Sequence, residues 1–112
     1  MTDPRHPELP EPIEVNELHG TEGGRWKVQT LGSVHVFNLD HPRTVTRHPG
    51  THAQPSINDV TRELLDIGTC VVGRRGYWTM KPDHYLLSHY WQATSLIQTI
   101  TRLPDEPDLD RE

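Results

Sequence analysis

Hydrophobic or β-branched residues alternate with polar ones over residues 26–30, and residues 33–39 resume extended structure. Residues 26–30 read Trp-Lys-Val-Gln-Thr, and residues 33–39 read Ser-Val-His-Val-Phe-Asn-Leu. A period of two is typical of a strand with one buried face, and the Leu-Gly pair at 31–32 suits a hairpin turn. A turn at 40–43 then leads to a third short run at 44–47. The pattern predicts a three-stranded meander.

The pattern is ambiguous in the middle of the chain. Val60 and Leu64 have the i,i+4 spacing of one helical face over 59–65. The apolar run at 64–72 instead favours a single strand. We expect one helical turn followed by a strand at 66–73.

The second half completes the fold. The residue pattern after position 72 predicts a turn at 73–76, a strand at 77–80, an aromatic-rich loop at 81–91 and a closing strand at 94–103. Six short strands between residues 25 and 103 predict an all-β fold, a small six-stranded barrel or roll of SH3-like or related type with at most one short helix. A flat sheet of this size would leave one face in water. The alternative is an α+β fold with one helix packed on an antiparallel sheet.

Charge is divided unevenly along the chain. Of 16 acidic and 11 basic residues, residues 1–24 hold six acids and one base, and residues 104–112 hold five acids and one base. The same flanks carry six of the ten prolines. Segments of this composition cannot offset their ordering entropy by burial. We therefore expect flexible acidic tails at 1–24 and 104–112 around a basic β-domain at 25–103.

Composition favours a cytoplasmic protein that does not bind membranes. Only 32% of the residues are hydrophobic, and no run approaches the ~18 apolar residues of a membrane span. The start of the chain lacks the basic and apolar regions of a signal peptide. The single cysteine excludes an intramolecular disulfide.

Part of the first half has a recognisable pattern. It comprises Arg-Trp-Lys-Val-Gln-Thr at 25–30, a Gly-Ser turn at 32–33, Asn-Leu-Asp at 38–40 and Thr-Val-Thr-Arg at 44–47. Over residues 25–50 the chain resembles short uncharacterised β-domain proteins of actinobacteria and their phages, which begin with a Trp-x-Val-x-Thr hairpin. The resemblance implies β structure and a GC-rich source, and it carries no activity.

Eight histidines raise the question of a metal site. His41, His48 and His52 lie close together beside Asp40. A Pro-Gly pair between the last two excludes the helix on which histidines four residues apart converge, and no cysteine or glutamate joins them at ligand spacing. We expect polar loop histidines, with no metal and no cofactor.

Catalytic motifs are missing from the sequence. No serine stands in a Gly-x-Ser-x-Gly context, and the glycine pairs lack the helix and lysine that follow a phosphate-binding loop. Cys70 lies in an apolar run, where burial raises the thiol pKa and lowers its reactivity. We expect a protein that is not an enzyme.

The acidic N-terminal flank, residues 1–24, contains two candidate linear motifs. One has a proline at every third position, so that its rings would share one face of a polyproline II helix. The other has apolar residues among acids. Either could order on a protein partner or fold back on the basic domain. The two motifs are Pro4, Pro7 and Pro10, and Ile13, Val15 and Leu18.

Cations and aromatic residues of the domain predict a contact surface. We expect a non-catalytic protein-interaction module, an adaptor or modulator of a bacterial protein, of cellular or phage origin. The alternative is a nucleic-acid-binding small β-barrel, in which arginines contact phosphates and Tyr and Trp side chains stack on bases. A homodimer through an exposed strand edge is compatible with both. The expected contact residues are Arg74, Arg75, Tyr77, His84, Tyr85, His89, Tyr90, Arg43 and Arg47.

The three tryptophans have two interpretations. Trp78 and Trp91 could stack on a ligand beside these arginines. The chain has only one phenylalanine, however, and a core this poor in large apolar residues must bury its tryptophans. We therefore expect Trp26, Trp78 and Trp91 to be core anchors.

Overall fold

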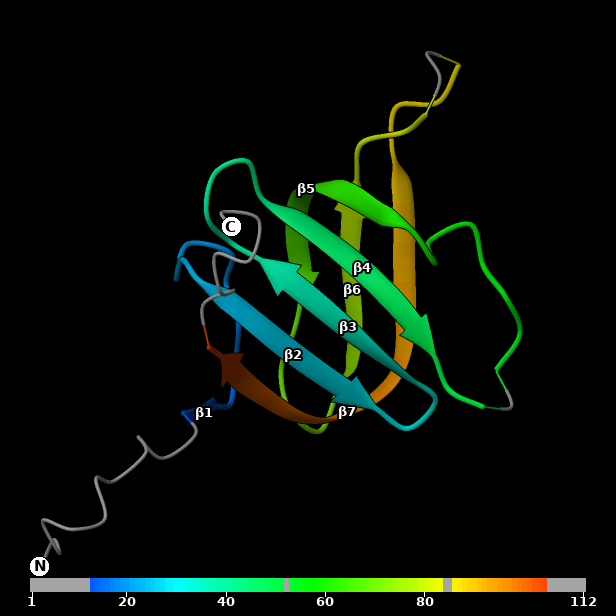
Figure 1. Cartoon of the computed structure of the whole chain (residues 1–112). Coiled ribbons are helices and arrows are strands. Elements are labelled where there is room, and N and C mark those ends of the chain that lie inside the picture. The colour runs from blue at the N-terminus through cyan, green and yellow to red at the C-terminus, as the bar shows by residue number, and fades with distance from the viewer. Residues whose placement is uncertain (1–12, 52, 84–85, 105–112) are drawn as a thin grey trace, which may run out of the picture.

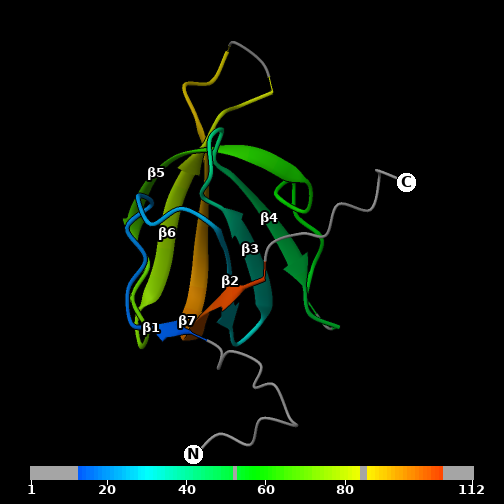
Figure 2. The ribbon, with the colours of Figure 1, turned by 60° about the vertical axis from the view of Figure 1, so that its left-hand side comes forward.

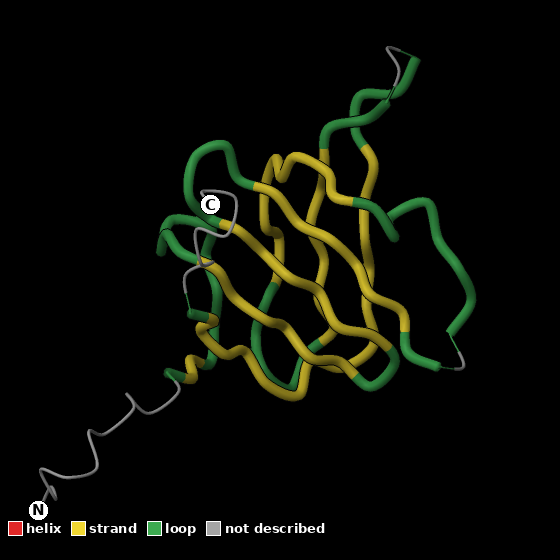
Figure 3. The backbone as a smooth tube through the Cα atoms, viewed as in Figure 1, coloured by secondary structure: helices red, strands yellow, loops and turns green. Residues whose placement is uncertain are grey.

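A computed structural model describes residues 13–51, 53–83 and 86–104. These residues contain seven antiparallel strands (Figure 1). None of these residues is helical (Figure 3), so the expected helical turn is wrong and the all-β class is confirmed over the α+β alternative. The same residues therefore contain no helix that could cross a membrane. The strands are β1 (Glu14–Val15), β2 (Arg25–Thr30), β3 (Ser33–Asn38), β4 (Thr44–Pro49), β5 (Thr61–Thr69), β6 (Arg75–Met80) and β7 (Tyr90–Leu103).

The sheet closes on itself through β7. The strand order is β7–β2–β3–β4–β5–β6, and β6 pairs with β7 again. The first half of β7, from Tyr90 to Leu96, pairs with β6, and the second half, from Ile97 to Leu103, pairs with β2. Shifts of register in three of the strand pairs accompany the curvature of the sheet (Figure 2). The result is the closed six-stranded barrel expected from the sequence, with β1 paired to β7 as a seventh strand.

The alternation of side chains places one residue in two inside the barrel. Trp26 from β2 is buried, as the alternation in its sequence predicts. Phe37 from β3 is buried together with the polar Ser33 and His35. Trp78 of β6 has no exposed surface, and it meets the rings of Phe37 and His35 edge-on at centroid distances of 4.8 and 5.0 Å. Trp26 and Trp78 are therefore core anchors. Trp91 is 58% exposed, so its expected place in the core is wrong.

The barrel begins before the expected boundary at residue 25. β1 pairs with the second half of β7, and Val15 packs against the core. Leu18 is 1% exposed, and its backbone N–H donates to a carbonyl at 2.9 Å. Residues 13–24 thus belong to the domain, and the prediction of a tail is wrong for them. The rest of the two expected tails, 1–12 and 105–112, lies outside the described residues.

A buried arginine explains why β5 resembles a helix in sequence. Arg62 and Leu64 both lie inside the barrel, so the strand has a period of two with a charged residue at one core position. A search for apolar residues alone does not detect this period. The Arg62 guanidinium lies 4.5 Å from the centroid of the Tyr90 ring and donates to the Asp83 carboxylate at 2.7 Å. The ring and the carboxylate together compensate for the burial of the cation.

Candidate interaction surface

Large apolar side chains are exposed on the outside of β6 and β7, which run side by side (Figure 2). Tyr77, Trp91 and Leu96 are 40%, 58% and 47% exposed. The register pairs Tyr77 with Ala93, two residues after Trp91. Leu96 is paired with Arg75 on the same two strands. We call Tyr77, Trp91 and Leu96 the outer apolar face.

A glycine on the neighbouring strand determines where the Tyr77 ring lies. A methyl group on Gly68 of β5 would lie 3.1 Å from Cδ2 of Tyr77 and 3.4 Å from its carbonyl oxygen. One edge of the ring therefore packs against the backbone of Gly68, which itself remains exposed, and a side chain at this position would displace the ring. This packing positions the Tyr77 ring while a large part of the side chain remains exposed.

Two arginines flank the outer apolar face where β6 begins. Arg74 lies in the turn before β6, and both Arg74 and Arg75 are exposed. Neither guanidinium forms an ion pair with a carboxylate of the residues that the structure describes. Cations beside an apolar surface suit a partner that carries both carboxylates and apolar groups.

The loop between β6 and β7 projects beyond the barrel (Figure 1). His84 and Tyr85, which the sequence analysis expects at the contact surface, lie outside the described residues. His89, also expected there, is half-buried. Leu86 and Leu87 are exposed. The described part of the loop thus adds apolar rather than aromatic surface.

Three other residues of the expected contact set have partners inside the fold. Tyr90 is 9% exposed and belongs to the core. The Arg43 guanidinium donates to two backbone carbonyls, at 2.6 and 3.3 Å. Arg47 forms an ion pair with Asp59 at 2.6 Å. Within the described residues, the exposed members of the expected set are Arg74, Arg75 and Tyr77, the last with 40% of its surface exposed.

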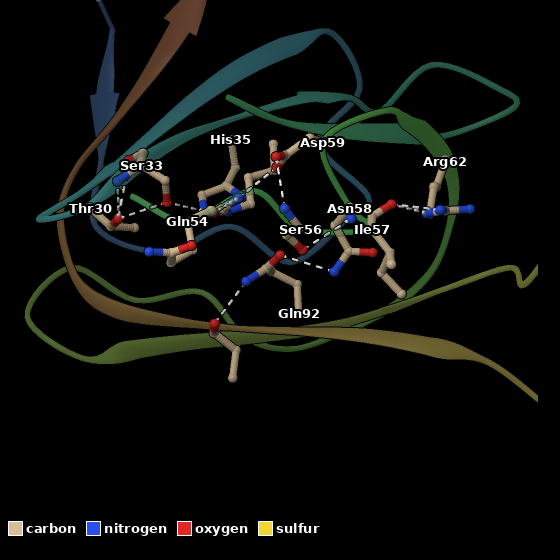
Figure 4. Close-up of polar contacts among 12 residues, drawn as sticks. Thr30, Ser33, His35, Gln54, Ser56, Ile57, Asn58, Asp59, Arg62 and Gln92 are labelled. Carbon is tan, nitrogen blue, oxygen red and sulfur yellow. Dashed lines mark hydrogen bonds and ion pairs between the residues drawn. The ribbon is translucent and has the colours of Figure 1, made fainter. Parts of the chain in front are cut away.

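A chain of polar contacts lies inside the barrel (Figure 4). Ser33 Oγ lies 3.2 Å from Thr30 Oγ1 and 2.8 Å from Nε2 of His35. His35 has no exposed surface, and none of the described residues is a hydrogen-bond partner for its Nδ1. Burial, together with the charges of Arg47 and His48, lowers the pKa of His35 from 6.5 to about 4. The imidazole is therefore neutral at pH 7.

Among the described residues, this serine–histidine pair has no carboxylate that would orient a catalytic imidazole. The Asp59 carboxylate instead accepts hydrogen bonds from the Arg47 guanidinium at 2.6 Å and from the backbone N–H of Ser56 at 2.9 Å. Burial acts to raise the pKa of Asp59, but these two hydrogen bonds outweigh it and hold the pKa below its ordinary value. With no orienting carboxylate and no solvent access at His35, the cluster has the features of a structural network.

The loop before β5 is attached to the start of β7. The Asn58 side-chain amide donates to Oε1 of Gln92 at 3.0 Å (Figure 4). It also donates to the backbone carbonyl of Trp91 at 3.0 Å. Asn58 is 6% exposed. The backbone of Trp91 is therefore held by a buried amide while its side chain stays on the surface.

The described residues contain no group of three His, Cys, Asp or Glu side chains that could hold a metal ion. Of the histidines considered for such a site, His41 and His48 are exposed and His52 lies outside the described residues. A surface hollow near the β2–β3 turn has no titratable side chain among its described lining. That lining is Leu31, Gly32, Gly50, Thr51 and Ala53.

Cys70 is expected to resist thiol reagents in the native protein. It is 1% exposed, and burial, aided by the charges of Glu22 and Glu17, raises the pKa of its thiol to about 12. Because the thiolate is the reactive form, labelling at pH 8 should be at least ~100-fold slower than in denaturant. Mass spectrometry after timed exposure to iodoacetamide measures this ratio. Equal rates in the two conditions would contradict the burial of Cys70.

The sequence pattern does not place Trp91 and Leu96 on the outer apolar face. The predicted closing strand begins at residue 94, whereas β7 begins at Tyr90. Once the period of two is extended back to Tyr90, which points inward, Trp91 falls on the outer side. Leu96 has no distinguishing motif, and only the pairing of β6 with β7 brings it beside Arg75.

Fold and surface together define a small closed β-barrel with an exposed apolar face flanked by two arginines. No family model, curated protein or solved structure matches the chain. The resemblance over residues 25–50 therefore stays a prediction, and we infer function from the residues of the chain itself.

Proposed function

We propose that this protein is a non-catalytic protein-interaction module, an adaptor or modulator, whose contact surface is the outer apolar face. The observation that carries the proposal is the exposure of Tyr77, Trp91 and Leu96 on two paired strands. The core does not need them, because Trp26, Trp78 and the other buried residues fill the barrel. Aromatic side chains with nearby arginines are the residues that contribute most to binding in protein interfaces.

The fixed positions of these side chains also support binding. The Tyr77 ring rests on Gly68, and the backbone of Trp91 is held by Asn58. A contact surface that is already ordered loses little conformational entropy when a partner docks. The closed barrel leaves little free strand edge, so side chains rather than added strands are the expected means of contact.

Selection from a random peptide library displayed on phage tests the proposal. The library is selected on the full chain, and the enriched peptides are measured against Trp91→Ser and Tyr77→Ser. We expect each substitution to weaken binding by tenfold or more, about 1.4 kcal/mol, because each removes a large apolar contact. Circular dichroism and thermal melting confirm that both variants remain folded.

Ile13→Ser is the matched control. Ile13 is an apolar residue with 54% exposure, and its carbonyl accepts a hydrogen bond from Arg102 at the far end of β7. Peptides that bind the outer apolar face should retain their affinity for this variant. Selection that yields no peptide dependent on Tyr77 or Trp91 would refute the proposal.

Nucleic-acid binding is the second candidate. Arg75 lies two residues before Tyr77 on β6, and Trp91 lies further along the same face, paired with Thr79. This combination of cations and exposed rings on one face suits a single strand. The ion pair of Arg47 and the carbonyl contacts of Arg43 leave fewer cations for phosphates than the sequence suggests. Titration of oligo(dT) and oligo(U) into the full chain at several salt concentrations tests this candidate. Affinity that falls steeply with salt and is lost in Trp91→Ser would favour it.

A further inference from the structure

The sequence contains a segment whose chemistry matches the outer apolar face. Residues 1–12 carry prolines at positions 4, 7 and 10, with three carboxylates and one arginine. In a polyproline II helix, which has three residues per turn, these prolines share one face and the ring spacing is about 9 Å. Such a segment needs no internal hydrogen bonds and presents apolar rings together with charge.

The outer apolar face has the two features that recognise such a segment. Exposed aromatic rings are the usual contacts for proline rings, and Tyr77 and Trp91 lie near each other on paired strands. Arg74 and Arg75 lie at the end of the same face and have no carboxylate partner among the described residues. Their charge is opposite to the net charge of residues 1–12.

We propose that the outer apolar face binds acidic segments with a proline at every third position, and that residues 1–12 of this chain are such a ligand. Proline rings pack on Tyr77 and Trp91, and the carboxylates face Arg74 and Arg75. This inference rests on the proposed function and names the chemical class of its partner.

The direction of β1 favours binding of residues 1–12 to the outer apolar face of a second molecule. Residue 12 precedes Ile13, whose carbonyl accepts the backbone N–H of Arg102 at 2.8 Å. Along β7, Arg102 is about 20 Å from Leu96 and about 30 Å from Ala93, the partner of Tyr77. In the polyproline II conformation Pro4 would lie at most about 28 Å from Ile13, short of Ala93. Because β1 is antiparallel to β7, the chain also enters β1 from the side of Arg102 that faces away from Leu96. The same segment of a second molecule could bind without this limit.

A synthetic peptide of residues 1–12 is the probe for this proposal. It is titrated into a full-length chain in which Pro4, Pro7 and Pro10 are all replaced by serine, so that the surface has no competing ligand of its own. We expect saturable shifts of the Trp91 indole N–H signal and of the backbone amide signals of β6 and β7 in NMR spectra, and the amide signals report binding in the variants that lack Trp91. Adding Trp91→Ser should weaken binding by tenfold or more, and Arg74→Glu with Arg75→Glu should weaken it further at low salt.

A second peptide with the same composition, in which no two prolines are three residues apart, is the matched control. It should bind at least tenfold more weakly, because its rings no longer share one face. The wild-type chain should bind the first peptide more weakly than the serine variant does. If this difference in peptide affinity does not depend on protein concentration, residues 1–12 of the same molecule compete with the peptide. If the difference grows with protein concentration, residues 1–12 of a second molecule compete.

The outcomes separate this inference from the proposed function. If peptides from the random library depend on Tyr77 and Trp91 while the 1–12 peptide causes no shift, the interaction surface stands and this ligand is wrong. Equal binding of the two peptides, or binding that Trp91→Ser leaves unchanged, also overturns the inference, because general attraction to cations then accounts for it.

Discussion

Replacing Trp78 by alanine is expected to lower the free energy of unfolding by about 3–5 kcal/mol. Trp78 is completely buried at the centre of the barrel and contacts the rings of Phe37 and His35 edge-on. Alanine would leave a cavity that the surrounding strands cannot fill, because each is paired on both sides. Urea unfolding followed by far-ultraviolet circular dichroism measures the loss.

Gly76 provides an internal control for this effect. A methyl group there would lie 2.6 Å from Cζ3 of Trp78 and 3.1 Å from Cδ1 of Ile97. Gly76→Ala should therefore destabilise the protein by about 1–3 kcal/mol through overpacking, and by clearly less when Trp78→Ala is already present. Additive effects of the two substitutions, or a cost below about 1 kcal/mol for Trp78→Ala, would contradict the packing described.

His35 is expected to make the protein lose stability between pH 6.5 and pH 4. Its pKa is about 4 in the folded protein and near 6.5 when unfolded, so between these values the unfolded chain binds the additional proton. Stability due to this group is complete above pH 6.5 and falls as the pH decreases. This difference between the folded and unfolded pKa values lowers the free energy of unfolding by about 3 kcal/mol at pH 4.

The measurement compares wild type with His35→Gln, whose amide can still bond to Ser33. Urea unfolding at intervals from pH 7 to pH 4 gives two curves, and their difference isolates His35 from the other titrating groups. His41→Gln, which removes an exposed imidazole that is not among the groups shifting the pKa of His35, is the control. A wild-type curve parallel to that of His35→Gln throughout this range would show that His35 is not the group responsible.

The strands with regular alternation could be predicted from the sequence. β2 and β3 both bury every second residue, and in β2 the buried members Trp26 and Val28 are apolar, as the alternation in its sequence indicates. In β3 the buried Ser33 and His35 are polar, so only its extended character, and not its buried face, follows from the sequence. The turn between them contains glycine, which permits a tight connection. Local sequence therefore contains the information for this hairpin, and the six-stranded barrel follows from the number and spacing of such runs.

The errors occur where burial depends on partners distant in sequence. Arg62 lies in the core because Tyr90 and Asp83 stabilise its charge, and neither is near it in the sequence. Leu18 lies in an acidic stretch, yet it is buried because β1 pairs with β7. For Trp91, the direction of the side chain depends on where β7 begins. Local composition could not supply these long-range pairings.

The position of β7 has a consequence for how the protein folds. β7 is the last strand in sequence order, and it is hydrogen-bonded to β1, β2 and β6. A nascent chain that lacks residues 90–103 therefore has β2 and β6 with unpaired edges, and such edges promote association with other chains. Closure of the barrel also joins residues far apart in sequence, a feature of slow-folding β proteins. Protection from aggregation during synthesis thus depends on the final segment of the described chain.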